Sequence, residues 1–409
     1  MKNRFSRVIT ISLILIIGFL TGCNKPSITE EERLAYYDLN RQNSLRMFKS
    51  VMYNTSGGKR EELFKIVHIS DAHVSSWSNG NNIQNSYNLK EAVRFANDTV
   101  AKINVMVATG DHINNHMTTS RTDAIIYLNY FTNTLYSNNN IPAFTSTGNH
   151  DVNMLNPDYA TYALSKADLY NLLTSKTNHN IYSDGMENYY YADLVNPMGG
   201  TIRTIALDVT DQEELIYSTQ HNAILSQKQI DWLCHTALKK DMTEHHSVII
   251  LIHHPLPAED EAYNRVVFNE FLHNWYMIPD IIESFRTKQT LTQKYRNKLN
   301  VSDSISVDVS FDNSPGEFIC YLGGHLHTYL DYEVKSTIHS TLPKQIMILA
   351  NNMSPTEKSE TTHIERNDVG LRNNTFNMYA IDTKKKMIYV TFFGATSFYY
   401  PDIITFPYL

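Results

Sequence analysis

The sequence has few cysteines, few glycines and prolines, and a small share of charged residues. Its 409 residues include 3 Cys, 15 Gly and 12 Pro, and Asp, Glu, Lys and Arg make up 19%. Three cysteines are too few for the thiolate-rich sites of zinc fingers and iron–sulfur clusters. A net charge of −7 lacks the basic footprint of a nucleic-acid scaffold. The apolar share of 42% excludes a disordered or collagen-like chain, while 17 histidines leave open a site of imidazoles and carboxylates, which suits Zn, Mn or Fe.

The first 22 residues have the pattern of an export signal. A basic start precedes the apolar run Val8–Leu20, whose 13 residues fall short of the roughly 20 that span a bilayer. The run ends in Leu20-Thr21-Gly22-Cys23, which resembles the lipobox of bacterial lipoproteins. We therefore expect residues 1–22 to be a lipoprotein signal peptide and Cys23 to carry the lipid; an ordinary signal peptide or an N-terminal anchor helix is the alternative. This predicts a lipid-anchored protein of the bacterial cell envelope, in the outer membrane if the host has one, because Asn24 rather than Asp follows the cysteine.

The remaining chain divides into three parts. Residues 23–62 are expected to be a stalk or an N-terminal helix packed on the domain, because apolar residues recur on one side of a helix over 27–53. Residues 63–395 are expected to be the main domain, and 396–409 a C-terminal tail.

From residue 63 onward, short apolar runs alternate with helical stretches, which predicts parallel strands joined by crossover helices. The first strands expected are 64–69, 104–109 and 142–147, with helices at 88–101 and 122–136. Further on we expect helices at 157–175 and 226–239, a hairpin of 188–194 with 201–208, strands at 247–252 and 317–322, and an antiparallel meander of 345–349, 377–381 and 387–393. Residues 256–315 fit this rhythm poorly: they contain a long helical stretch, 269–299, interrupted at Pro279, and we expect this insertion to be a helical cap.

Five of the predicted strands end in residues that commonly bind metal ions. They run into Asp71-Ala72-His73, Gly110-Asp111, Gly148-Asn149-His150-Asp151, His253-His254-Pro255 and Gly323-Gly324-His325-Leu326-His327. Ligand sites in open α/β sheets lie beyond the carboxyl ends of the strands, so we expect the five clusters to meet in one crevice. Each cluster alone is a weak signal, because a single Asp-x-His pair or Gly-Asp turn is common at a surface. Their occurrence in order, each at a strand end, is hard to produce by chance.

These residue types suit a site for two metal ions. A carboxylate can bridge two ions, and His, Asp and Asn can complete each coordination shell. Two ions about 3.5–4 Å apart stabilise the attacking and leaving oxygens of a phosphoryl displacement and lower the pKa of bound water, which yields hydroxide near neutral pH. One further histidine is needed near the leaving oxygen as an acid.

On these motifs the sequence resembles the calcineurin-like metallophosphoesterase family. The resembling segments are Asp71-x-His73, Gly110-Asp111-x-x-Asn114, Gly148-Asn149-His150-Asp151, His253-His254-Pro255 and Gly324-His325-x-His327, within about residues 63–395. The resemblance implies an α/β fold in which two mixed β-sheets pack as a sandwich flanked by helices, with a dinuclear centre at the strand ends. It says little about the substrate.

The resemblance also implies a role for each motif residue. One ion would be held by Asp71, His73, Asp111 and His327, and the other by Asp111, Asn149, His253 and His325. Asp111 would therefore bridge the two ions. His150 would contact the phosphate and protonate the leaving group, and Asp151 would orient His150.

Four further residues of the motif region are of interest: His112, Asn114, His116 and His254. Of these, His112, Asn114 and His254 are candidates for contact with the substrate or for support of the metal ligands. The resemblance favours His253 as the ligand in the His-His pair, and strand alternation is expected to place His254 on the opposite side. Purple acid phosphatases within this family carry Tyr where this sequence has Asn114, so we expect Mn, Fe(II) or Zn pairs rather than a tyrosinate-bound ferric ion. His112 and His116 are expected to be solvated loop residues, with a substrate contact as the alternative.

The sequence thus predicts a dinuclear-metal-dependent phosphoester hydrolase, a phosphodiesterase or a phosphomonoesterase, that uses a metal-activated hydroxide and is anchored through Cys23. The alternative is a surface ligand-binding lipoprotein on the same fold with little or no turnover. The absence of His-Glu-x-x-His, Gly-x-Ser-x-Gly and P-loop motifs counts against zinc peptidases, serine hydrolases and P-loop enzymes. The expected partners are a phosphoester of unidentified structure and the membrane. Four aromatic residues could stack on a base or sugar but are more readily explained as core packing: Tyr189, Tyr190, Tyr191 and Trp275.

Overall fold

Two large mixed β-sheets and flanking helices make up the described part of the chain, as the fold prediction requires. The computed structural model describes residues 29–56, 59–75, 81–114, 119–154, 161–211, 222–223, 225–260, 271–272, 276–296, 304–353 and 371–408. The predicted signal peptide and Cys23 lie outside these residues.

The first large sheet contains six strands in the order β19-β18-β17-β3-β4-β5. In that order they are Ile404–Pro407, Met387–Gly394, Thr375–Asp382, Phe64–Ile69, Val105–Thr109 and Ala143–Ser146. β3, β4 and β5 are parallel, and their residues are buried throughout, which explains their near-continuous apolar sequences. The crossover helices α3 (Asn81–Ala96) and α4 (Arg121–Thr132) follow β3 and β4, so the predicted βαβαβ unit is confirmed.

The second large sheet contains seven strands in the order β15-β16-β14-β10-β8-β7-β6. In that order they are Leu330–Val334, Gln345–Leu349, Glu317–Gly323, His246–Leu251, Thr201–Ala206, Tyr190–Val195 and Tyr182–Ser183. β8, β10, β14 and β16 are parallel, and the expected hairpin is confirmed as β7–β8. The predicted meander is partly wrong. β17 and β18 pair antiparallel in the first sheet, whereas β16 belongs to the second.

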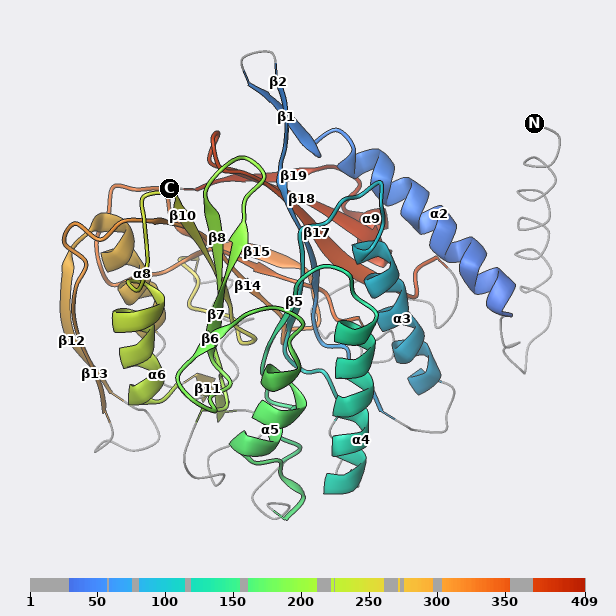
Figure 1. Cartoon of the computed structure of the whole chain (residues 1–409), viewed down its shortest axis with the longest axis horizontal. Coiled ribbons are helices and arrows are strands. Elements are labelled where there is room, and N and C mark those ends of the chain that lie inside the picture. Colours follow the sequence, from blue (N-terminus) through green and yellow to red (C-terminus); the bar gives the residue numbers. More distant parts are fainter. Residues whose placement is uncertain are drawn as a thin grey trace.

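The core has three apolar layers. The layer between the sheets includes Ile66, Val107 and Phe144 from the first sheet and Ile249, Leu251 and Ile319 from the second. Helices α2 (Glu30–Phe48), α3 and α4 cover the outer face of the first sheet. Helices α6 (Gln227–Trp232) and α8 (Met277–Thr287) cover the outer face of the second, together with the hairpin of β12 (Thr290–Arg296) and β13 (Ser304–Ser310) (Figure 1). The remaining elements are β1 (Tyr53–Ser56), β2 (Lys59–Glu62), α5 (Lys166–Leu172), β9 (Asn222–Ala223), β11 (Phe271–Leu272) and α9 (Ala395–Tyr399).

The N-terminal helix α2 is packed on the domain. It begins with a capping box, in which Thr29 Oγ1 accepts a hydrogen bond from Glu32 N and the Glu32 carboxylate accepts one from Thr29 N. On its buried side, Ser44 Oγ donates to the carbonyl of Phe392 in β18. The helix predicted over 27–53 is therefore present as the shorter α2, which lies against the first sheet.

The helix expected over 269–299 is wrong on both sides of α8: residues 271–272 form strand β11, and the chain leaves the helix after residue 287. Helix α8 ends at Thr287, because Lys288 takes the left-handed conformation (φ 56°). Residues 290–296 then form β12. Pro279 does not interrupt a helix but lies in the first turn of α8, where its missing N–H is tolerated. The described part of the insertion 256–315 packs on the outer face of the second sheet, and its role as a cap stays a prediction.

Two smaller helix predictions are also longer than the helices found. Among the described residues, the helix expected at 157–175 is α5 and a short 3-10 helix, Thr174–Lys176, while 155–160 lie outside the described residues. The helix expected at 226–239 is α6 followed by a π-helical turn, Leu233–Ala237.

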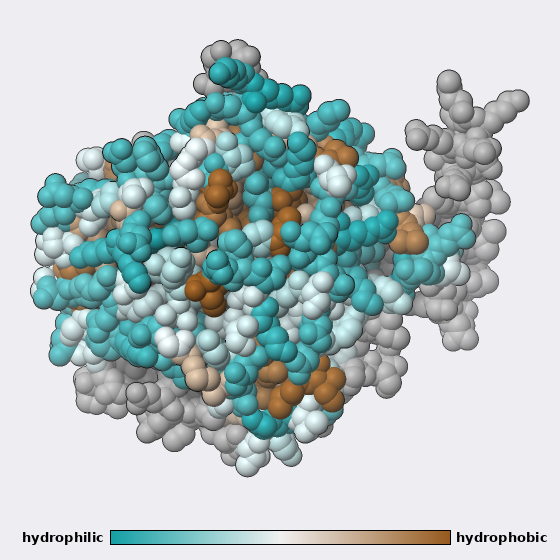
Figure 2. Space-filling model, viewed as in Figure 1, coloured by the Kyte–Doolittle hydropathy of each residue, from teal (hydrophilic) through white to brown (hydrophobic). Residues whose placement is uncertain are grey.

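The described surface is mostly hydrophilic, with apolar residues in small separate groups on the face shown in Figure 2. Exposed large apolar side chains come from different elements, as with Ile126 in α4, Tyr182 in β6 and Val195 in β7. Cys234 and Cys320 are buried free thiols. Among the described helices, none is long and apolar enough to cross a membrane.

Candidate metal centre

The loops after β3, β4 and β14 bring together a first group of four possible ligands: Asp71, His73, Asp111 and His327. The Nε2 atoms of His73 and His327 lie 3.0 Å apart, and Asp71 Oδ1 lies 3.4 Å from His327 Nε2. Their ligand atoms all lie within 4.8 Å of one another. Asp71, His73 and Asp111 are buried, while the His327 side chain keeps 19% of its surface exposed. Three of the four side chains are therefore shielded from solvent, and solvent reaches the group at His327.

The loops after β5, β10 and β14 place a second group next to Asp111. His253 Nε2 lies 3.1 Å from Asp111 Oδ2, and its Nδ1 donates to the carbonyl of Thr109 (2.7 Å), which orients the ring. His325 Nδ1 lies 3.1 Å from Asn149 Oδ1. The structure thus brings all seven residues expected to bind metal into two groups that share Asp111.

Five residues of these loops have a left-handed backbone: Asp71, His73, Asp111, His325 and His327, with φ between 45° and 73°. Such a conformation costs a non-glycine residue roughly 1–2 kcal/mol. Hydrogen bonds between the loops hold it, since Asp71 N donates to the carbonyl of Gly110 and His73 N to that of Asp111. This backbone conformation turns the candidate ligand side chains toward one another.

Two glycines allow the loops to approach closely. A Cβ at Gly148 would overlap the backbone nitrogen and the carboxylate of Asp111. A Cβ at Gly324 would overlap Ser70 Oγ and lie 2.5 Å from Asp71 Oδ2. The glycines of the motifs are therefore required by packing against the ligands.

Neighbouring charged side chains shift the pKa values of residues in both groups. Burial raises the pKa of Asp71, but the neighbouring His327 and His253 together outweigh burial and lower it to about 2. Burial lowers the pKa of His253, but the carboxylates of Asp111 and Asp71 and the Thr109 carbonyl together outweigh burial and raise it to about 9. His253 thus carries a proton beside the Asp111 carboxylate, and a divalent cation would compete with that proton.

Asp151 ties two ligand loops together. Its Oδ1 accepts from His112 N and its Oδ2 from Gly148 N, both at 2.8 Å. Burial and the neighbouring Asp111 carboxylate raise the pKa of Asp151 to about 8, against the effect of these hydrogen bonds. The expectation of a solvated His112 is wrong: its ring is buried and stacks on Phe131 of α4, with ring centroids 4.2 Å apart.

His150 lies at the rim of the first group. Its ring meets that of His73 edge-on, with centroids 4.8 Å apart, and its Nε2 lies 3.9 Å from Asp111 Oδ2. Its backbone N–H donates to Asp111 Oδ1 (2.9 Å). The side chain is 12% exposed, so it is more accessible than the buried ligands.

His254 does not lie on the opposite side from His253, so that expectation is wrong. Strand β10 ends at Leu251, and two-residue alternation no longer applies at the His-His pair. The His254 ring stacks on His325, with centroids 4.1 Å apart and an interplanar angle of 27°. Asn114 is partly buried and its N–H donates to the carbonyl of Val74, while the neighbouring residues 115–118, including His116, lie outside the described residues.

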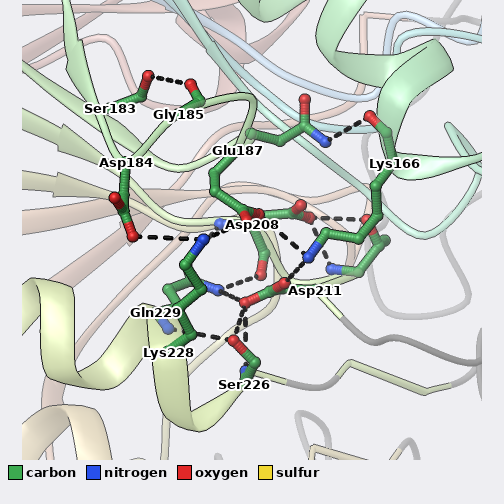
Figure 3. Close-up of polar contacts among 12 residues, drawn as sticks. Lys166, Ser183, Asp184, Gly185, Glu187, Asp208, Asp211, Ser226, Lys228 and Gln229 are labelled. Atoms are coloured by element: carbon green, nitrogen blue, oxygen red, sulfur yellow. Dashed lines mark hydrogen bonds and ion pairs between the residues drawn. The ribbon is translucent and has the colours of Figure 1, made fainter.

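A buried polar network, which sequence reasoning missed, holds the loop after β5. Thr147 and Asp208 pair in parallel across the two large sheets, and Thr147 Oγ1 donates to Asp208 Oδ1. The same oxygen accepts from N and Oγ1 of Thr210, at 2.9 and 2.7 Å. Nearby, Asp211 accepts from Lys166 Nζ and Ser226 Oγ (Figure 3). The sequence feature that points to this network is the position of Asp208 at the end of a predicted strand.

Both groups fit divalent metal ions. Bonds of about 2.0–2.2 Å place two ligand atoms of one ion about 3–4.4 Å apart. The spacings of 3.0 and 3.4 Å in the first group and 3.1 Å in the second agree with this. Imidazole, carboxylate and amide donors together suit Mn, Fe and Zn.

The model of the calcineurin-like phosphoesterase family matches residues 64–329, which is more than half of the chain. The matched segment begins at β3 and ends just after His327, so it includes both groups of ligands. A search of curated proteins finds no match.

Proposed function

The chain belongs to the calcineurin-like phosphoesterase family, and on that premise we propose that it is a dinuclear, divalent-metal-dependent phosphoester hydrolase. The observation that carries the proposal is the convergence of the expected ligands into two groups with Asp111 between them. A shared fold alone does not establish an activity. A complete set of mutually oriented ligands, most of them buried, favours turnover over a binding protein on a degenerate fold.

The chain would hold two ions of Mn, Fe or Zn. The first would be bound by Asp71, His73 and His327 and the second by Asn149, His253 and His325, with Asp111 shared. Bound there, the ions would polarise the phosphoester oxygens and lower the pKa of water, so that hydroxide is available near neutral pH.

His150 would serve as the acid for the leaving oxygen. Burial lowers the pKa of His150, but a phosphate anion beside the ring favours its charged form. The charged ring can then give its proton to the leaving oxygen. Asp151 supports this role from the backbone, because its bonds to Gly148 N and His112 N fix the turn that carries His150.

The substrate is a phosphomonoester or a phosphodiester. Tyr189, Tyr190 and Tyr191 are at most 1% exposed, which confirms the core-packing interpretation and removes them as stacking residues for a substrate. Trp275 lies outside the described residues.

We further propose attachment to the cell envelope through a lipid on Cys23. The support is the lipobox-like sequence Leu20-Thr21-Gly22-Cys23 after a short apolar run.

The proposal is tested on the full chain purified in detergent and freed of metal with a chelator. Turnover of p-nitrophenyl phosphate, bis(p-nitrophenyl) phosphate and a nucleotide panel is measured with and without Mn²⁺, Zn²⁺ and Fe²⁺. We expect turnover only with added metal, its loss in His327→Ala, and its retention in the matched variant His339→Ala, whose imidazole is exposed on a later loop. Tight metal binding without turnover on any substrate would contradict the hydrolase and favour the ligand-binding alternative.

A further inference from the structure

His254 is a buried polar side chain beside the metal centre that the proposed mechanism does not use. It is 2% exposed. Neither Nδ1 nor Nε2 has a hydrogen-bond partner among the described residues. A buried polar atom left without a partner costs about 1–3 kcal/mol, so a ring with two such atoms implies a binding partner from outside the chain.

The surroundings of His254 indicate what that partner is. Its ring stacks on His325 at 4.1 Å and lies edge-on to His253 at 5.2 Å. One nitrogen from each of the three rings lies within 4.8 Å of the others, a spacing that one metal ion can span. A packing role explains the stacked ring but leaves both nitrogens unsatisfied, whereas ligation satisfies one of them.

We propose that His254 is a third imidazole ligand of the second metal ion, beside His253 and His325. The inference rests on the proposed function, since it requires that the centre binds metal. The second ion would then have three imidazoles, the Asn149 amide oxygen and the shared Asp111 carboxylate as its donors. The first ion would have two imidazoles and two carboxylates.

This difference in donors predicts a difference in selectivity. Imidazole-rich sites favour Zn²⁺, Co²⁺ and Fe²⁺ over Mg²⁺ and Ca²⁺, which prefer oxygen. The second group should therefore take a borderline ion such as Zn²⁺ or Co²⁺ before the first group does, and the two ions should bind with unequal affinity.

The test is a Co²⁺ titration of the metal-free full chain, followed by visible absorption and by calorimetry. His254→Phe keeps an aromatic ring against His325 but removes both nitrogens. We expect the wild type to bind two ions. In His254→Phe, the Kd of the tighter ion should rise at least about tenfold and its absorption should change. His246→Phe is the matched control, because His246 is a buried histidine at the other end of β10, and it should bind both ions as the wild type does.

The results of the Co²⁺ titration distinguish a failure of the His254 proposal from a failure of the proposed hydrolase function, on which it rests. Wild-type Kd values and an unchanged spectrum in His254→Phe would overturn the role of His254 while leaving the hydrolase intact. A wild type that binds no Co²⁺ and shows no metal-dependent turnover would instead contradict the proposed function. If His254→Phe does not fold, His254→Gln gives the same comparison. Its amide oxygen in place of a nitrogen must shift the Co²⁺ absorption, so an unchanged spectrum would again overturn the inference.

Discussion

Gly324→Ala should damage the first metal group although it adds one methyl group at a residue that binds nothing itself. The new Cβ would overlap Ser70 Oγ and lie 2.5 Å from Asp71 Oδ2. Neither neighbour can move aside without loss. Ser70 is buried and its Oγ donates to the carbonyl of Thr109 (2.7 Å), and both oxygens of Asp71 accept from His325 N at 3.1–3.2 Å.

The size of the expected loss in stability can be worked out from these contacts. Overpacking a buried site costs about 1–3 kcal/mol, and the lost Ser70 hydrogen bond costs about 0.5–1.5 kcal/mol more. We therefore expect the free energy of unfolding to fall by about 2–4 kcal/mol. Because Asp71 is displaced, the Kd of the first ion should rise about 10- to 100-fold.

The assay combines urea unfolding of the metal-free chain with a metal titration. Gly185→Ala is the control for an added methyl group without a clash: a Cβ there meets no atom within 4 Å, although Gly185, unlike Gly324, has a positive φ (75°). It should cost only about 1 kcal/mol of backbone strain and leave the Kd values unchanged. Our reasoning would be refuted if Gly324→Ala changed stability by less than about 0.5 kcal/mol, the usual range for neutral surface changes, and bound metal as the wild type does.

Three further predictions concern other parts of the chain. Asp208→Ala removes the acceptor of Thr147 and Thr210 and should lower the free energy of unfolding in urea by about 2–4 kcal/mol, whereas Asp208→Asn, which keeps an oxygen acceptor, should lose less. Burial raises the pKa of Glu91 from 4.5 to about 7. The folded chain therefore holds a proton that the unfolded chain releases, and stability falls as pH rises from about 4.5 to 7. Glu91→Gln should thus be more stable than the wild type by about 1–3 kcal/mol at pH 8 and equal to it at pH 4, measured by urea unfolding. Cys23→Ser should move the protein from the membrane fraction to the soluble fraction after cell lysis.

Each of these three predictions can be contradicted by its own measurement. Equal losses in Asp208→Asn and Asp208→Ala would contradict the role of the oxygen acceptor. A pH-independent effect of Glu91→Gln would contradict the raised pKa. Unchanged membrane fractionation of Cys23→Ser would refute lipid anchoring.

The parallel part of the fold and the convergence of the candidate ligand residues could be predicted from the sequence. Strands buried on both faces have near-continuous apolar sequences, and the ligands follow them directly in the loops at 71–73, 110–111 and 148–151. The strand-end rule then places these loops together without knowledge of the strand order.

Features that depend on tertiary contacts could not be predicted. In β12, Leu291 and Tyr295 are buried four residues apart, which is a helical spacing, and only the pairing with β13 makes the segment a strand. The apolar run of β16 contains no signal of which sheet it joins. His254 lies beyond the end of β10, where alternation no longer predicts the direction of a side chain.

We propose that Asp111 joins the two groups into one phosphoester-hydrolysing metal centre. The most direct test is Asp111→Asn, which keeps the shape of the side chain but removes the charge. Bound metal per chain and turnover of bis(p-nitrophenyl) phosphate are measured in the same preparations. We predict two ions and metal-dependent turnover in the wild type, and weaker binding of both ions with no turnover in the variant. Two tightly bound ions and wild-type turnover in Asp111→Asn would show that the two ions do not share the Asp111 carboxylate.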